Sequence, residues 1–173
     1  MIWLVGCSIA VLIIAFYLRH HAKERVTALG LSGEAVYWDG GTDNEVFVSH
    51  AHGLTGKPDY ILKISGYLVP VERKSRHVSV AGPHEGEILQ LAAYCLLVEE
   101  RFRRRVQRGQ LQYPNRSFAI SFNDQLRSKL LEALRALREA DAVGDVPRSH
   151  NSPARCRGCG FKAVCKDSLA PCS

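Results

Sequence analysis

An apolar segment followed directly by basic residues begins the chain. No charged residue occurs from Ile2 to Leu18, and Trp3 and Tyr17 stand near the two ends of this segment. A helix over it would be about 26 Å long, close to the thickness of a hydrocarbon core. Arg19 and Lys23 follow at once, and positive charges mark the cytoplasmic side. We therefore expect residues 2–18 to form a single-pass anchor in the cell membrane, with a cytoplasmic C-terminal domain; a buried core helix is the alternative.

The next part of the chain alternates short apolar runs with glycine-containing turns, a pattern typical of strands. It predicts strands over residues 35–38, 45–49, 59–64 and 67–74. Residues 75–82 look like a loop. This stretch therefore favours a sheet built from short strands.

Helical patterns follow. A long helix is predicted from Pro83, a favourable first-turn residue, to about Gly109. Residues 116–122 alternate phenylalanine and isoleucine with other residues, which is strand spacing. Asn123 can cap a second helix over residues 124–142, whose leucines recur on one face. The order of strands, helix, strand and helix favours an α/β or α+β core in which helices flank one sheet.

Composition narrows the class of protein. The chain has 173 residues, of which 46% are hydrophobic and 23% charged, and this suits one globular domain rather than a disordered or polytopic membrane protein. The net charge of +6 points to nucleic acid or an anionic membrane surface as partner. We divide the chain into residues 1–25 (anchor and basic flank), 26–150 (folded domain) and 151–173 (cysteine segment).

A pair of carboxylates carries the most informative chemistry. If Ser65 and Gly66 form a two-residue hairpin turn, Asp59 falls directly opposite Glu72 on the neighbouring strand. Like charges at such positions are destabilising. A divalent cation between the two carboxylates would offset the repulsion, and hard oxygen ligands suit Mg²⁺ or Mn²⁺.

Three more side chains extend this candidate site. Lys74 shares a strand face with Glu72, where it could hold or deprotonate an attacking water. Gln90 and Tyr94 are four residues apart and share one face of the long helix. The set fits metal-assisted hydrolysis of a phosphodiester. Polar strand and helix faces with incidental charges are the alternative.

Five arginines lie at the end of the predicted long helix. They could bind DNA phosphates, contact anionic lipid, or form a solvated helix end that complements the helix dipole. They are Arg101, Arg103, Arg104, Arg105 and Arg108.

Cysteines are concentrated at the other end of the chain. Structural disulfides are rare in the cytoplasm, so clustered thiols there are better candidates for metal ligands. A step of two intervening residues is common to zinc and iron–sulfur sites, and the spacing alone separates the two poorly. The four candidates are Cys156, Cys159, Cys165 and Cys172.

Several of these motifs together resemble a known group of enzymes. Residues 53–59, GLTGKPD, look like motif II of the PD-(D/E)XK nuclease superfamily, and residues 71–74, VERK, look like its E-x-K motif. Gln90 with Tyr94 looks like the Q-x-x-x-Y motif, and the cysteines resemble a C-terminal cluster. The closest resemblance is to the CRISPR-associated, RecB-like exonuclease family, the fourth in the Cas series, over about residues 45–166.

The resemblance implies a restriction-endonuclease-like fold with a central mixed sheet flanked by helices. It also implies that Asp59, Glu72 and the Arg73 carbonyl bind the metal, that Lys74 assists catalysis, and that Gln90 and Tyr94 contact DNA or position water. The substrate would be DNA, often single-stranded and cut from an end. The cysteines would hold an iron–sulfur cluster, with Cys172 in place of a missing upstream ligand; structural zinc is the alternative.

The chain departs from the family where a metal-binding histidine is expected before the strands. Its candidates are His20, His21, His50 and His52, none of them in a matching motif. The leading hypothesis is a membrane-anchored, metal-dependent deoxyribonuclease, with DNA, the membrane, and a second copy or DNA-processing proteins as partners. A catalytically weak DNA-binding or scaffold module is the second hypothesis, and a zinc-binding interaction protein at the membrane is the third.

Overall fold

The structure, a computed structural model, divides into two compact units, Met1–Leu131 and Glu132–Ser173. We describe each unit by itself. The predicted domain boundaries after residues 25 and 150 stay predictions. The described parts of the chain are residues 12–14, 33–40, 45–144 and 146–169.

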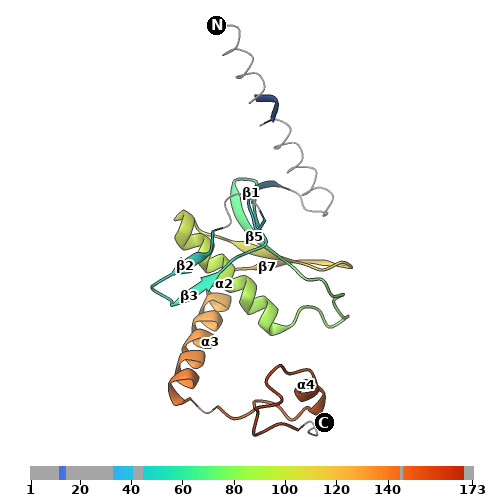
Figure 1. Cartoon of the computed structure of the whole chain (residues 1–173). Helices are drawn as coiled ribbons and strands as arrows, with labels where there is room; N and C mark the ends of the chain where they lie inside the picture. The colour runs from blue at the N-terminus through green and yellow to red at the C-terminus, as the bar shows by residue number, and fades with distance from the viewer. Residues whose placement is uncertain (1–11, 15–32, 41–44, 145, 170–173) are drawn as a thin grey trace. The chain divides into compact units, whose positions relative to one another are not determined.

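A five-stranded mixed sheet forms the centre of the first unit (Figure 1). Its strands lie in the order β1-β4-β5-β6-β7. β5 and β6 are parallel, and the other neighbouring pairs are antiparallel. β2 and β3 form a separate antiparallel hairpin. The strands are β1 (Glu34–Trp38), β2 (Phe47–Ser49), β3 (Leu54–Gly56), β4 (Tyr60–Ile64), β5 (Tyr67–Arg73), β6 (Arg108–Gln112) and β7 (Ser117–Ser121).

Helix α2 (Glu85–Phe102) connects the parallel strands β5 and β6 and packs against both of them and against the β2–β3 hairpin. Its middle is apolar, and Leu91, Leu97 and Val98 are buried. Leu62 and Val71 from β4 and β5 form a fully buried pair in the sheet. The predicted mixed α/β core is therefore present.

The hairpin between β4 and β5 has the register that the sequence predicted. Ser65 and Gly66 both have positive φ, 50° and 84°, as a two-residue turn that matches strand twist requires. Ile64 then pairs with Tyr67 and Tyr60 with Val71. The register fixes which residues follow at the open end of the hairpin, where the candidate site lies.

The end of the long helix differs from the prediction. α2 ends at Phe102 because Arg103 adopts a left-handed conformation with φ 50°, and the chain turns back there. The side chain of Glu99 accepts a hydrogen bond from the backbone N–H of Val106, 2.9 Å away. The prediction that the helix continues to Gly109 was wrong, since β6 begins at Arg108.

Gly109 lies where α2 crosses β6, and the contact leaves no room for a side chain. A Cβ at this position would be 2.7 Å from Cγ of Leu91. We expect Gly109→Ala to lower the free energy of unfolding by about 1–3 kcal/mol through overpacking, measured by urea unfolding. Gly86→Ala is the matched control, because a Cβ added there would meet no atom within 4 Å and the residue lies in α2. That change should stabilise the chain by about 0.5–1 kcal/mol. Equal effects of the two substitutions would contradict this packing.

Helix α3 (Asp124–Val143) begins in the first unit and agrees with the predicted second helix. The side chain of Asn123 accepts a hydrogen bond from the N–H of Leu126 at 2.9 Å, as predicted for its cap. In the second unit, α4 (Pro153–Arg157) was not predicted. The Arg148 side chain donates to the carbonyl of Asp167 at 2.9 Å, which ties the two ends of this segment together.

The membrane part of the predicted fold needs correction. Within the described stretches, no helix has both the length and the apolar character to span a bilayer. The two longest, α2 and α3, carry several charged residues each. This finding contradicts the predicted transmembrane element and the predicted single-pass localisation in the cell membrane, and we do not retain them. Of the predicted span, residues 2–11 and 15–18 lie outside the described residues.

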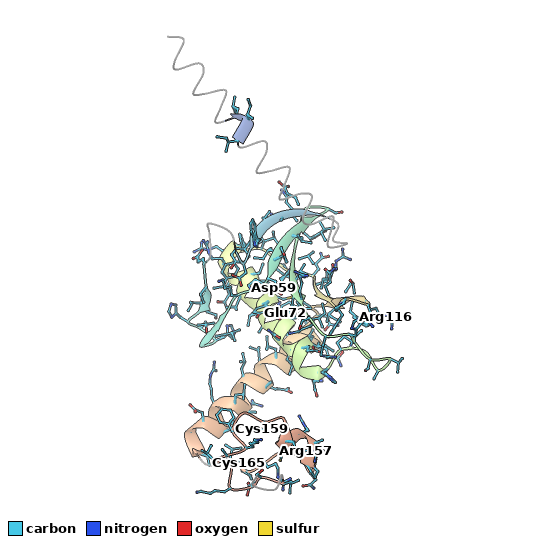
Figure 2. All side chains as sticks on the ribbon, turned by 45° about the vertical axis from the view of Figure 1, so that its right-hand side comes forward. Asp59, Glu72, Arg116, Arg157, Cys159 and Cys165 are labelled. Carbon is cyan, nitrogen blue, oxygen red and sulfur yellow. The ribbon has the colours of Figure 1, made fainter. Side chains whose placement is uncertain are left out.

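The predicted cysteine cluster is also corrected. Cys156 is buried in α4, and its sulfur accepts the N–H of Leu169 at 3.4 Å, whereas Cys159 and Cys165 are exposed (Figure 2). No group of three histidine, cysteine or acidic side chains in the described residues is arranged to hold a metal ion. Cys172 lies outside the described residues. We therefore do not retain the metal cluster as part of the fold.

Candidate active site

Asp59 lies at the open end of the hairpin, one residue before β4 (Figure 2). Its Oδ2 accepts a hydrogen bond from the backbone N–H of Arg73 at 2.7 Å, across the hairpin. Its carbonyl accepts a second bond from the N–H of Asp39 at 2.9 Å. Asp59 is therefore held by its side chain on β5 and by its backbone on the residue after β1.

Glu72 lies near the end of β5 and is only 7% exposed. Its Oε1 accepts hydrogen bonds from Nζ of Lys74 at 2.9 Å and from Nε2 of Gln90 at 3.0 Å. Lys74 also donates to Oε1 of Gln90 at 2.7 Å, and Gln90 Nε2 lies 3.0 Å from the hydroxyl oxygen of Tyr94. The structure thus brings four predicted site residues, from β5, the segment after it and α2, into one hydrogen-bonded network.

The electrostatics of this network disfavour the charged form of Glu72. Burial raises the pKa of Glu72 above its ordinary value of 4.5, and the neighbouring charge of Asp59 raises it further. The hydrogen bond and positive charge of Lys74 act in the opposite direction without cancelling the rise. Burial also raises the pKa of Tyr94, with a smaller contribution from Glu72. The repulsion between carboxylates that the sequence indicated is therefore present.

An open cleft of about 340 Å³ lies beside the network. Asp59, Arg73 and Lys74 line it, whereas Glu72, Gln90 and Tyr94 are not among its lining residues. Asp39, Tyr60 and Ser75 complete the lining. Of the residues that the sequence singled out, the cleft thus gives a phosphate group access to Asp59, Arg73 and Lys74.

The donor set fits a hard divalent cation. Oδ1 of Asp59 and Oε2 of Glu72 accept no hydrogen bond from another described residue. Mg²⁺ is usually bound through one or two carboxylates and keeps several waters for substrate phosphates to replace. Two carboxylates near a cleft, without a third protein ligand of the same kind in the described chain, match that mode of binding.

The predicted upstream histidine is not found at this site. Nδ1 of His52 lies 2.8 Å from Glu100 and 3.2 Å from Ser49, on the α2 side of the β2–β3 hairpin. His50 is exposed at the turn after β2, whereas His20 and His21 lie outside the described residues. Sequence reasoning missed Asp39 instead. Asp39 begins an Asp-Gly-Gly sequence, which is typical of the glycine-containing turns between strands and gives no sign of a contact with Asp59.

The five arginines do not form one patch of unpaired charge. Arg101 pairs with Glu45 at 3.1 Å, Arg105 pairs with Asp124 at 3.0 Å, and Arg104 donates to the carbonyl of Gly66 at 3.0 Å. Arg103 forms the left-handed end of α2, and Arg108 begins β6. DNA binding by Arg101, Arg103, Arg104, Arg105 and Arg108 stays a prediction.

Comparison with known proteins decides the family. A family model of the PD-(D/E)XK nuclease superfamily matches residues 12–166, which is most of the chain. The chain belongs to this superfamily. Glu72 and Lys74 are the first and last residues of a three-residue E-x-K element at the end of β5 and just after it, and the two side chains are hydrogen-bonded, as a shared site requires.

Two curated relatives are similar to the chain. The CRISPR-associated exonuclease Cas4 of Francisella tularensis subsp. novicida (strain U112) is 28% identical over 120 residues, covering 69% of this chain and 59% of its own length. The Cas4/endonuclease Cas1 fusion of Leptospira interrogans serogroup Icterohaemorrhagiae serovar Lai (strain 56601) is 26% identical over 125 residues, covering 69% of this chain and 23% of the relative. The chain thus spans less than two thirds of either relative.

Among solved structures, the crystal structure of SSO0001 is similar to the chain. It covers 73% of this chain and 58% of its own, with 18% sequence identity and a TM-score of 0.44.

The raised pKa of Glu72 has a consequence for stability. The folded protein favours the protonated form of Glu72. The stability that protonation of Glu72 contributes is therefore complete below the unfolded-state pKa and is lost as the pH rises through the folded-state pKa. In EDTA at pH 8, Glu72→Gln should therefore raise the free energy of unfolding by about 1 kcal/mol, as substitutions that relieve active-site repulsion commonly do. At pH 4 the difference should vanish. Urea unfolding at both pH values tests this, and a less stable variant at pH 8 would contradict it.

Proposed function

We propose that this protein is a metal-dependent deoxyribonuclease that hydrolyses phosphodiester bonds at the cleft beside Asp59 and Glu72. The observation that carries the proposal is the network in which Glu72, Lys74 and Gln90 bond one another within 3.0 Å at the open end of the hairpin. Membership of a nuclease superfamily and the two Cas4 relatives support the same activity.

Asp59 and Glu72 would hold Mg²⁺ or Mn²⁺, together with the Arg73 carbonyl by resemblance to the superfamily. When bound, the cation supplies a Lewis acid that stabilises charge on the phosphate and favours ionisation of a water. The side chains of this site have their own tasks. Lys74, fixed by Glu72 and Gln90, presents an ammonium group toward the negative charge that develops on the phosphate.

Gln90 fixes the direction of that ammonium group. Its amide oxygen accepts from Lys74, and its amide nitrogen donates to Glu72, so one side chain orients both charges. Because Tyr94 contacts the same amide nitrogen, the four groups hold one another in place. A site whose groups are held in place before the substrate binds loses less free energy when the transition state forms.

We further propose DNA with single-stranded ends as the substrate, cut exonucleolytically, and DNA-processing proteins as partners. The names of the relatives, an exonuclease and a fusion of that exonuclease with an endonuclease, support these finer points. The basic net charge of +6 suits a polyanionic substrate. A second copy of the chain is a further candidate partner.

A direct test uses the full chain with end-labelled single-stranded, duplex and circular DNA in Mg²⁺, Mn²⁺ or EDTA. Cation-dependent cleavage of linear single-stranded DNA supports the proposal. Cleavage of circular DNA would show that the activity is endonucleolytic instead of exonucleolytic. Binding of DNA without cleavage in either cation would favour a scaffold module that keeps the fold. The absence of a histidine from the described cleft is the observation that favours that second candidate.

A further inference from the structure

Lys57 is a cation placed close to the proposed metal ligand. Lys57 and Asp59 flank Pro58, whose side chain is buried in the core. Residues two apart in extended chain share one face, about 6.6 Å apart, and proline holds the residue before it in that conformation. The ammonium group of a lysine can span this distance. Left alone, it would pair with the carboxylate of Asp59 and compete with a divalent cation.

The structure pairs Lys57 with another carboxylate instead. Nζ of Lys57 lies 2.5 Å from Oδ1 of Asp39, at the end of β1. The backbone N–H of the same Asp39 donates to the carbonyl of Asp59 at 2.9 Å. Asp39 therefore contacts the chain on both sides of Pro58, through its side chain on Lys57 and through its backbone on Asp59.

Asp39 is also part of the cleft. It lines the same open space as Asp59, Arg73 and Lys74. The side chains of Lys57 and Asp39 are 28% and 35% exposed, so each is within reach of solvent and of an arriving ion. No described group of three acidic or histidine side chains is arranged as a metal site, so the geometry gives Asp39 a role other than that of a third ligand.

We propose that Asp39 is a positioning residue that draws the ammonium group of Lys57 away from Asp59 and so keeps the Asp59 carboxylate available to a divalent cation. This inference rests on the proposed function. In the Lys57–Asp39 ion pair, the Asp39 carboxylate neutralises the ammonium group of Lys57. Lys57 stays beside Asp39, which lines the cleft, and this pairing prevents the lysine from occupying the cation's place at Asp59.

The test measures Mn²⁺ affinity of the full chain by electron paramagnetic resonance, without DNA. We expect Asp39→Asn to weaken Mn²⁺ binding about fivefold, the size set by one partly exposed ion pair. Asparagine keeps the backbone N–H that bonds Asp59. Lys57→Gln should bind Mn²⁺ at least as tightly as the wild type. The double variant should return to within about twofold of Lys57→Gln, because the competing ammonium group is gone.

The double variant separates this role from simpler ones. If Asp39 were a ligand, or acted only through its own negative charge, its replacement would weaken binding by the same factor whether or not Lys57 is present. The double variant would then bind Mn²⁺ about fivefold more weakly than Lys57→Gln, and the proposal would be overturned. Unchanged binding in Asp39→Asn, or a variant that does not fold by circular dichroism, would overturn it too. Loss of Mn²⁺ binding in Glu72→Gln is required by the proposed function alone. A wild type without such binding would therefore remove both proposals, whereas an unaffected Asp39→Asn removes only this one.

Discussion

Replacing Glu72 by alanine should lower the rate of cation-dependent DNA cleavage by at least about 1000-fold, because one of the two carboxylates that hold the cation is lost. The loss should appear as weaker cation binding as well as slower cleavage. Lys74 and Gln90 would each lose a hydrogen-bond acceptor, so the remaining groups would also be less well oriented. Cleavage rates over a range of Mg²⁺ and Mn²⁺ concentrations measure both effects.

Glu132→Ala is the matched control for that substitution. Glu132 is an exposed residue within α3, and alanine is a good helix former, so cleavage and stability should change little. A Glu72→Ala variant that retained a tenth or more of the wild-type rate at saturating Mg²⁺ would show that Glu72 is not a cation ligand. Thermal unfolding of both variants ensures that folded proteins are compared.

Replacing Lys74 by methionine should lower kcat by about 100-fold to 10,000-fold, the range typical of a positioned acid–base or charge-stabilising group. The cation affinity of Lys74→Met should change in the opposite direction from that of Glu72→Ala. Removing a positive charge 2.9 Å from Glu72 should leave Mn²⁺ affinity equal to or higher than in the wild type. This difference in sign separates the role of the amine from that of the carboxylates.

Lys63→Met is the control for the amine. Lys63 is exposed on β4 in the same hairpin, opposite Leu68, and lines no part of the cleft. Its replacement should leave kcat and Mn²⁺ affinity unchanged. If Lys74→Met kept full kcat, or lost activity only through weaker Mn²⁺ binding, the role proposed for Lys74 would be wrong.

The hairpin register could be predicted because it depends on local chemistry. Gly66 readily adopts positive φ, and with Ser65 it forms a two-residue turn that fixes every pair down to the open end. The placement of Glu72 beside Lys74 follows from strand alternation alone. Gln90 and Tyr94 follow equally from helical periodicity.

The missed features depend on contacts distant in the sequence. Residues 101–105 are mostly arginine, a good helix former, and carry no glycine or proline that would indicate the end of α2. The Glu99 side chain caps the turn after α2 by accepting a hydrogen bond from the N–H of Val106. Helical periodicity does not show such a contact. The role of Asp39 in the site was missed for the same reason. Its position depends on the pairing of β1 with β4, which tertiary packing determines.

The charge of the basic cluster was predicted from composition, but its partners were not. Glu45 and Asp124 neutralise two of the five arginines, and they lie 56 and 19 residues away in the sequence. A net charge therefore states that cations are in excess, without stating which of them face a ligand. The same holds for the terminal cysteines, whose spacing resembled a metal site although the described side chains do not converge.

Titration calorimetry with Mn²⁺ on the wild type, Asp59→Asn and Glu72→Gln, with Glu132→Gln as control, asks directly whether two carboxylates share one cation. We predict one cation site that is present in the wild type and in the control, and that each of the two carboxylate substitutions weakens by at least about tenfold. Equal Mn²⁺ binding in all four proteins would contradict the conclusion that Asp59 and Glu72 hold one cation between them.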